Sequence, residues 1–161
     1  MRERSMLYWG LGTGAVVLLL DQWTKAFFSQ LLWHSGITLI PGFLNLDLVH
    51  NQGAAFGMFR SLEPMWRDGI LVLVAVVAVV LIVAMLRKTP DLFSALALGL
   101  VLGGAIGNLV DRLRFGWVVD FIHVHWYELS WPVFNVADSG ITVGIGMLIW
   151  QSFFFNKDGS R

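Results

Sequence analysis

The chain alternates between long apolar runs and shorter polar segments, and its apolar runs are long enough to cross a lipid bilayer. Ile70–Leu86 contains 17 consecutive residues drawn only from Ala, Val, Ile, Leu and Met. A membrane-spanning helix needs roughly 17–25 predominantly apolar residues. A lipid-exposed span must also satisfy its own backbone hydrogen bonds, so we predict helices. Four spans are expected, at about residues 7–28, 69–86, 92–113 and 135–155.

Composition agrees with an integral membrane protein. Of the 161 residues, 57% are hydrophobic and 14% are charged, and the mean hydropathy is +0.69, unlike a typical soluble domain. The formal net charge is zero, so we expect no nucleic-acid partner. The absence of cysteine excludes disulfides and thiol nucleophiles. No small-x-small cleavage site follows the first apolar run, so we interpret it as a span and not as a cleavable signal peptide.

Loop lengths and charge predict how the chain is threaded. The short link 87–91 makes the second and third helices an antiparallel hairpin, so the longer segments 29–68 and 114–134 fall on one side and the termini on the other. The terminal and link residues hold 6 basic residues in 17, against 3 in 61 in the long segments. The positive-inside rule then places the termini in the cytoplasm and the long segments outside. We expect a single membrane domain over residues 1–161.

The outer segment 29–68 carries its own secondary-structure signals. Residues 37–40 and 44–49 flank Pro41-Gly42, and the second run alternates leucine with polar residues, which is typical of a strand bounded by a turn. Met65 and Trp66 lie among charged residues and predict a short interfacial helix before the second span. The expected fold class is an all-α membrane protein of four transmembrane helices with a small extracytoplasmic β unit.

Span counting places the unusual polar residues at one membrane face. Asn108, Asp111 and Arg112 follow i, i+3, i+4 spacing and share a helix face. Asp21 and Lys25 are four residues apart and can pair. The whole set comprises Asp21, Lys25, Asn51, Asn108, Asp111, Arg112, Asp120, Asn135 and Asp138. Their coincidence at one face predicts a functional site.

Each of these residues also has a structural interpretation. Lys25 can snorkel towards the interface, and Asp111 with Arg112 can form a salt-bridged helix end. Asn135 can cap the fourth helix while Asp138 interacts favourably with its dipole. Gly99, Gly103 and Gly107 recur every four residues, which favours close helix packing. These alternatives stay open at the level of the sequence.

Asp120 and Asp138 are the candidates for catalysis. A carboxylate beside hydrocarbon is costly and usually has a partner or a function. Two carboxylates together can activate water by acid–base chemistry. His123-x-His125 could bind a metal, but no cysteine or His-Glu-x-x-His motif completes a zinc site. Neither Ser61 nor Ser139 has a plausible His–Asp relay in its sequence context. We therefore expect no metal and no cofactor.

Five motifs in order resemble those of the lipoprotein signal peptidase (signal peptidase II) family. They are Asp21-Gln-Trp-Thr-Lys25, Asn51-Gln-Gly53-Ala-Ala-Phe56, Gly103-Gly-Ala-Ile-Gly-Asn-Leu-Val-Asp-Arg112, Val118-Val-Asp-Phe121 and Phe134-Asn-Val-Ala-Asp138. Each alone is weak, but five in order inside four spans are specific. The resemblance covers nearly the whole chain.

The resemblance implies a membrane aspartic peptidase of the bacterial inner membrane, with Asp120 and Asp138 as the catalytic pair at its outer face. The implied substrate is a prolipoprotein whose cysteine already carries diacylglycerol, cleaved just before that cysteine. Asp21, Lys25, Asn51, Gly53, Asn108, Asp111, Arg112 and Asn135 are expected to bind substrate or orient the pair. Membrane lipid is the other expected partner, and we expect a monomer.

Two other function classes compete with the peptidase. A small transporter or channel could use the intramembrane carboxylates as a relay, but no inverted repeat is visible. A scaffold for membrane assembly would need no chemistry at all. Cleavage of a lipidated precursor by the purified protein would separate all three.

Overall fold

The computed structural model describes residues 2–53 and 63–155. It consists of four helices and a small sheet in the order α1 (Arg2–Leu31), β1 (Ile37–Ile40), β2 (Leu44–Asn51), α2 (Pro64–Lys88), α3 (Leu92–Phe115), β3 (Val118–Trp126), β4 (Leu129–Ser130) and α4 (Val136–Phe155). Residues 54–62, which include the end of the Asn51–Phe56 motif, lie outside the described residues. All four predicted helices are present, with the expected α2–α3 hairpin.

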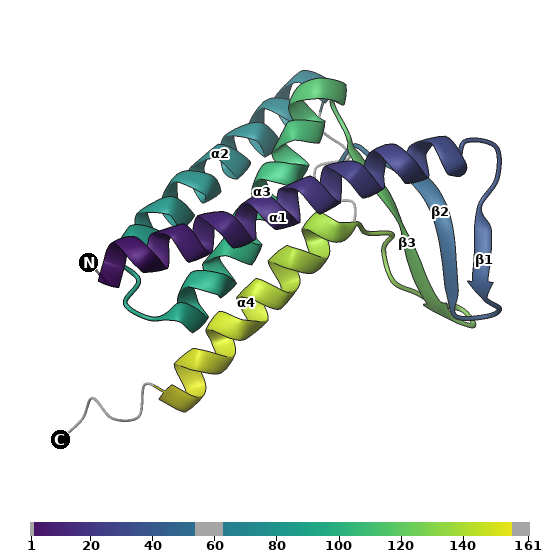
Figure 1. The fold of residues 1–161 in the computed structure, drawn as a ribbon. Coiled ribbons are helices and arrows are strands. Elements are labelled where there is room, and N and C mark those ends of the chain that lie inside the picture. Colours follow the sequence, from purple (N-terminus) through teal and green to yellow (C-terminus); the bar gives the residue numbers. More distant parts are fainter. Residues whose placement is uncertain (1, 54–62, 156–161) are drawn as a thin grey trace.

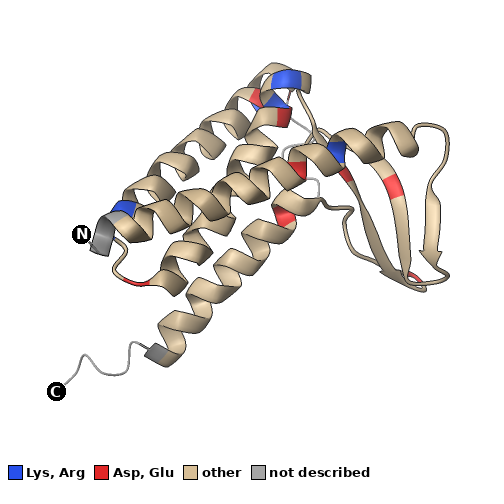
Figure 2. Cartoon of the chain, in the orientation of Figure 1, with Lys and Arg blue, Asp and Glu red and all other residues tan. Residues whose placement is uncertain are grey.

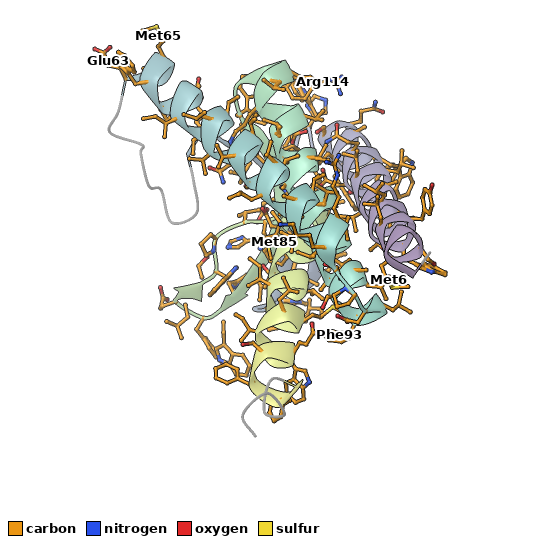
Figure 3. All side chains as sticks on the ribbon, turned by 90° about the vertical axis from the view of Figure 1, so that its left-hand side faces the viewer. Met6, Glu63, Met65, Met85, Phe93 and Arg114 are labelled. Atoms are coloured by element: carbon orange, nitrogen blue, oxygen red, sulfur yellow. The ribbon has the colours of Figure 1, made fainter. Side chains whose placement is uncertain are left out.

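The helices bundle at one end of the molecule and the sheet lies at the other, alongside the C-terminal part of α1 (Figure 1). α3 is central, because it packs against α1, α2 and α4. Two of the described helices, α2 and α3, are long and apolar enough to cross a membrane by length and hydropathy. Figure 3 shows side chains projecting outward from α2 between Met65 near its start and Met85 near its end.

The sheet is antiparallel with strand order β1-β2-β3-β4. β1 and β2 confirm the predicted strands around Pro41-Gly42. β3 runs beside β2, so that Asn51 pairs with Val118 and Val49 with Asp120. Phe134 forms a bridge with Ile122, and the Phe121 and Ile122 N–H groups both donate to the Phe134 carbonyl. This bridge brings the residues just before α4 alongside the start of β3.

The expected interfacial helix at Met65-Trp66 is not confirmed as a separate element. Both residues lie in the first turn of α2. This helix begins at Pro64, and Glu63 is its N-cap residue. Proline suits this place, because its fixed φ is helical and its missing N–H would have no partner there. Arg67 and Asp68 also lie in α2, so the helix extends beyond the apolar run at its N-terminal end.

The glycine stripe of α3 lets α1 approach backbone to backbone. A side chain at Gly99 would meet the Gly10 carbonyl, and one at Gly103 would meet the Gly14 carbonyl. A separate buried cluster between α2 and α3 contains Leu86, Ala95, Leu98 and Leu102. Close contact of this kind replaces the hydrophobic driving force that lipid does not supply.

We predict that Gly103→Ala destabilises the protein and that Gly12→Ala does not. A methyl group at position 103 must push α1 and α3 apart, which costs about 1–3 kcal/mol of unfolding free energy. Position 12 has nothing within 4 Å of an added Cβ, so alanine there should be neutral or stabilising by up to about 1 kcal/mol. Thermal unfolding of both variants in the same detergent measures this, and equal midpoints would contradict it.

Candidate active site

Asp138 lies in the first turn of α4, where it takes part in a reciprocal helix cap. The Asp138 N–H donates to Asn135 Oδ1 over 2.9 Å, and the Asn135 N–H donates back to Asp138 Oδ2 over 3.3 Å. This is the arrangement of a capping box, with asparagine and aspartate in the two roles. The other carboxylate oxygen of Asp138 accepts from Asn108 Nδ2 over 2.7 Å. Both oxygens of Asp138 are therefore held.

Asp120 lies near the start of β3, and it is 1% exposed. Its two oxygens accept hydrogen bonds from different amides: Asn135 Nδ2 lies 2.6 Å from Oδ1, and Asn51 Nδ2 lies 3.0 Å from Oδ2. Asn51 reaches this position because β2 runs beside β3. The Oδ1 of Asn51 in turn accepts from the Gly53 N–H, which fixes the orientation of its amide.

Two asparagine amides link the carboxylates. Asn135 Nδ2 lies 3.2 Å from Asn108 Oδ1. Because Asn135 also contacts Asp120, and Asn108 also contacts Asp138, the four side chains form one continuous hydrogen-bonded chain. Asn135 is fully buried and Asn108 is 8% exposed. The structure thus brings together Asp120 and Asp138 from different elements, 18 positions apart in the sequence.

The surroundings of Asp120 favour its protonated form. Burial and, after it, the negative charge of Asp138 raise the pKa of Asp120 to about 7. The hydrogen bonds from Asn51 and Asn135 and the charge of Lys25 act in the opposite direction. Loss of water around a carboxylate and a nearby like charge both disfavour ionisation. Asp120 can therefore hold a proton at neutral pH, as a general acid must.

Arg112 lies on α3 near the two carboxylates, and its side chain is half-buried. Its guanidinium makes two long contacts, each 3.4 Å, to the carbonyls of Asn108 and Gly53. No salt bridge to Arg112 is present among residues 2–53 and 63–155. A guanidinium has five N–H donors, so the contacts within residues 2–53 and 63–155 leave donors of Arg112 unused.

Asp21, Lys25 and Asp111 form a buried ionic cluster on the helix side of the site. Lys25 Nζ lies 2.8 Å from Asp21 Oδ2 and 2.9 Å from Asp111 Oδ2, which confirms the expected Asp21–Lys25 pair. Lys25 is 3% exposed, so it does not snorkel to an interface. Figure 2 shows that charged residues are sparse along the helices and gather around the junction of α1, α3 and α4 with the sheet.

Gln22 belongs to this cluster, although it was not singled out from the sequence. Its Nε2 donates to Asp111 Oδ1 over 2.9 Å. The available signal was its place beside Asp21 in the first motif, as an uncharged polar residue in an apolar helix. Helix rotation decides whether such a residue faces lipid or a neighbouring helix, and the sequence alone does not give that rotation.

His123, the first histidine of His123-x-His125, contacts side chains on two neighbouring strands. His123 Nδ1 lies 2.7 Å from Asp47 Oδ2, and its Nε2 lies 2.8 Å from Ser130 Oγ. His123 therefore ties β2, β3 and β4 together through both ring nitrogens. Within the described residues, no cluster of three or more His, Cys, Asp or Glu side chains is placed to hold a metal ion.

The geometry suits acid–base chemistry on a water molecule. One carboxylate, Asp120, is placed to be protonated at neutral pH, and the other, Asp138, lies at a helix N-terminus, which favours negative charge. Amides hold both, and a guanidinium with spare donors lies beside them. This arrangement supports peptide hydrolysis better than ion conduction, because every oxygen of the two carboxylates is fixed by a hydrogen bond.

Comparison with known proteins agrees with this geometry. The sequence profile of signal peptidase (SPase) II matches residues 13–154. A lipoprotein signal peptidase of Syntrophotalea carbinolica is 45% identical over 91% of this chain and 89% of its own length. That of Teredinibacter turnerae is 46% identical over 91% of this chain and 88% of its own.

The fold is also that of known membrane enzymes. Two solved structures described as bacterial membrane enzymes, both 28% identical to this chain, superpose with TM-scores of 0.79 and 0.73. They match 94% and 92% of this chain, and 93% of each solved chain is covered. On the profile, the relatives and the fold together, this chain belongs to the signal peptidase II family and is a membrane-embedded peptidase of the aspartic type.

Proposed function

We propose that this chain removes the signal peptide from diacylglyceryl-modified prolipoproteins by cleaving just before the lipidated cysteine, with Asp120 and Asp138 as the catalytic pair. The observation that carries the assignment is the hydrogen-bonded chain Asp138–Asn108–Asn135–Asp120. It holds two carboxylates from different elements in one buried site. The relatives are named lipoprotein signal peptidases, which supports the same class of substrate.

In the proposed reaction, water attacks the scissile carbonyl directly and no covalent intermediate forms. Ionised Asp138 takes a proton from the water as its oxygen bonds to the carbonyl carbon. Protonated Asp120 hydrogen-bonds the carbonyl oxygen and stabilises the negative charge that develops there. Collapse of the tetrahedral intermediate breaks the C–N bond, and the proton that Asp138 took from the water passes to the leaving amine, which becomes the N-terminus of the cysteine.

The polar residues around the two carboxylates divide into two roles. Asn51, Asn108 and Asn135 orient the carboxylates, because each donates a hydrogen bond to one of them. Asn51 uses a donor of its Nδ2 on Asp120, so it is placed to orient that carboxylate. Arg112 is therefore the stronger candidate for binding a substrate carbonyl, and Gly53 contributes by placing its own carbonyl against Arg112 and its N–H against Asn51.

The proposed placement has four transmembrane helices, cytoplasmic termini and the site at the outer face of the bacterial inner membrane. The density of basic residues in the termini and the α2–α3 link supports this orientation. The diacylglycerol of the substrate would stay among lipid acyl chains beside the exposed apolar side chains of the helices. A monomer suffices, since all the proposed catalytic residues come from one chain.

We predict that Asp120→Asn and Asp138→Asn each reduce cleavage of a synthetic lipidated precursor to below about 1% of wild type. Neither should lower thermal stability much, because asparagine has nearly the shape of aspartate and cannot place a second negative charge in the buried site. Asp91→Asn, at the opposite end of α3, is the matched control and should cleave normally. The assay contains a chelator, so that adventitious metal cannot contribute. Near-normal turnover by either active-site variant would rule out the pair.

We predict that the cleavage rate falls as pH rises above about 7. The raised pKa of Asp120, about 7, means that the carboxyl is protonated below that pH and loses its proton above it. The general acid is then lost, and kcat/KM should drop by about tenfold per pH unit on the alkaline side. A rate profile between pH 5.5 and 9 in a zwitterionic detergent measures this. A rate that climbs steadily to pH 9 would contradict the assignment.

We predict that Arg112→Lys loses about tenfold or more in kcat/KM while thermal stability is largely kept. A planar guanidinium can direct parallel donors at a carbonyl, whereas an ammonium is a compact point charge. If Arg112 served only to reach the headgroups, lysine would replace it freely. Cleavage rate and melting temperature measured on the same preparation separate the cases. An unchanged rate would refute a substrate contact, and joint loss of rate and stability would show a structural role.

A further inference from the structure

The buried ionic cluster of Asp21, Lys25 and Asp111 has no direct contact with either proposed catalytic carboxylate, but it contacts the residues next to both of them. An ammonium has three N–H donors. Those of Lys25 point to Asp21 Oδ2 at 2.8 Å, Asp111 Oδ2 at 2.9 Å and Asn108 Oδ1 at 3.0 Å. The bond to Asp21 lies within α1 and the other two reach α3, and the three charged side chains are between 0% and 4% exposed. Lys25 therefore has no donor left for solvent or lipid.

Each carboxylate of the cluster holds the backbone one residue before a catalytic aspartate. Asp21 Oδ1 accepts from the Ala137 N–H over 2.9 Å, directly before Asp138. Asp111 Oδ2 accepts from the Val119 N–H over 3.1 Å, directly before Asp120. Since Lys25 binds both carboxylates, it joins the start of α4 to the start of β3 through two ion pairs.

The third bond of Lys25 fixes the orientation of an amide. Lys25 takes the oxygen of Asn108, so Asn108 must direct its NH₂ group to Asp138, 2.7 Å away. A flipped amide would place NH₂ against the ammonium and oxygen against the carboxylate, and both contacts would be repulsive. The same Asn108 oxygen also accepts from Asn135, which in turn holds Asp120.

We propose that Lys25 is a positioning residue for hydrolysis: with Asp21 and Asp111 it sets the relative placement of the Asp120 and Asp138 carboxylates, and it locks the Asn108 amide in its working orientation. The inference rests on the proposed function, because it concerns the same pair of aspartates. It assigns to Lys25 an effect on the catalytic step and none on substrate binding. Displacement of a reacting group by about 1 Å can lower a rate by about 100-fold.

The first test is Lys25→Met, which keeps the length of the side chain and removes its charge and donors. We expect kcat for a lipidated precursor peptide to fall by about 100-fold or more, while KM changes by less than about threefold. Asp91→Ala is the control for stability, because it removes the helix cap that accepts from the Ser94 N–H at the far end of α3. It should lower the melting temperature without lowering kcat. Rates are measured well below both melting temperatures.

A kcat for Lys25→Met that falls no further than that of Asp91→Ala would overturn the proposal and leave Lys25 a purely stabilising residue. A rise in KM with kcat unchanged would also overturn it, since that result shows a role in binding. Wild-type cleavage and the Asp120→Asn and Asp138→Asn variants test the peptidase assignment separately. If those two variants are inactive and Lys25→Met is normal, only the positioning role fails.

A second comparison holds even if Lys25→Met does not fold. Asp111 uses one oxygen, Oδ2, for both Lys25 and the Val119 N–H, while its Oδ1 contacts Gln22. Asp111→Asn can keep its oxygen at the Oδ2 position, so the contacts to Lys25 and the Val119 N–H stay and only the contact to Gln22 is lost. Gln22 cannot restore that contact by flipping, because its Nε2 also donates to Asp21 Oδ2 and the Gly107 carbonyl. Asp21 needs an acceptor at both oxygens, one for Ala137 and one for Lys25, so Asp21→Asn must lose one contact.

We therefore expect Asp21→Asn to lose at least about tenfold more kcat than Asp111→Asn, with KM near wild type for both. The order follows from the hydrogen-bond geometry, because both substitutions remove one negative charge from the same cluster. Equal losses, or a larger loss for Asp111→Asn, would contradict the proposal.

Discussion

A charge buried away from water must be paired or hydrogen-bonded, and this requirement governs the junction between the helices and the sheet. An uncompensated buried charge costs several kcal/mol, and this protein buries Asp21, Lys25, Asp111 and Asp120 almost completely. Each has partners from another element: α1 pairs with α3 through Lys25, α1 with α4 through Asp21, and α3 with β3 through Asp111. The elements are thereby fixed relative to one another by polar contacts, in a bundle whose lipid-facing surfaces supply little specificity.

Helix packing and electrostatics depend on each other in this arrangement. A Cβ at Gly107 would lie 2.5 Å from Asp21 Oδ2, so the last glycine of the stripe provides the space for a carboxylate. On the neighbouring face of α3, a side chain at Gly104 would meet the Ala137 carbonyl. The small residues of α3 therefore let α1 pack closely on one side and the start of α4 on the other. Without that approach, Asn108 could not reach both Lys25 and Asp138.

The sequence predicted those parts of the fold that depend on local pattern. Apolar runs located the helices, and the leucine alternation around Pro41-Gly42 located β1 and β2. The separate interfacial helix was not confirmed, because Arg67 and Asp68 continue α2 beyond its apolar part. β3 was harder to see, since Val118–Phe121 are buried on both faces and lack alternation. Span counting gathered the site residues at one face, but which amide holds which carboxylate depends on contacts such as Asn51–Asp120, 69 residues apart.

Asn135 and Asp138 show why a structural and a chemical interpretation of one residue need not exclude each other. Their reciprocal hydrogen bonds are a helix cap, worth about 1 kcal/mol in helix stability. The same bonds hold one oxygen of Asp138 and leave it at the positive end of a helix dipole, which favours its ionised form. Asp120 lies on a strand, where no such dipole exists. The two carboxylates therefore lie in different electrostatic surroundings, one at a helix N-terminus and one on a strand. A pair needs such a difference if one member is to act as base and the other as acid.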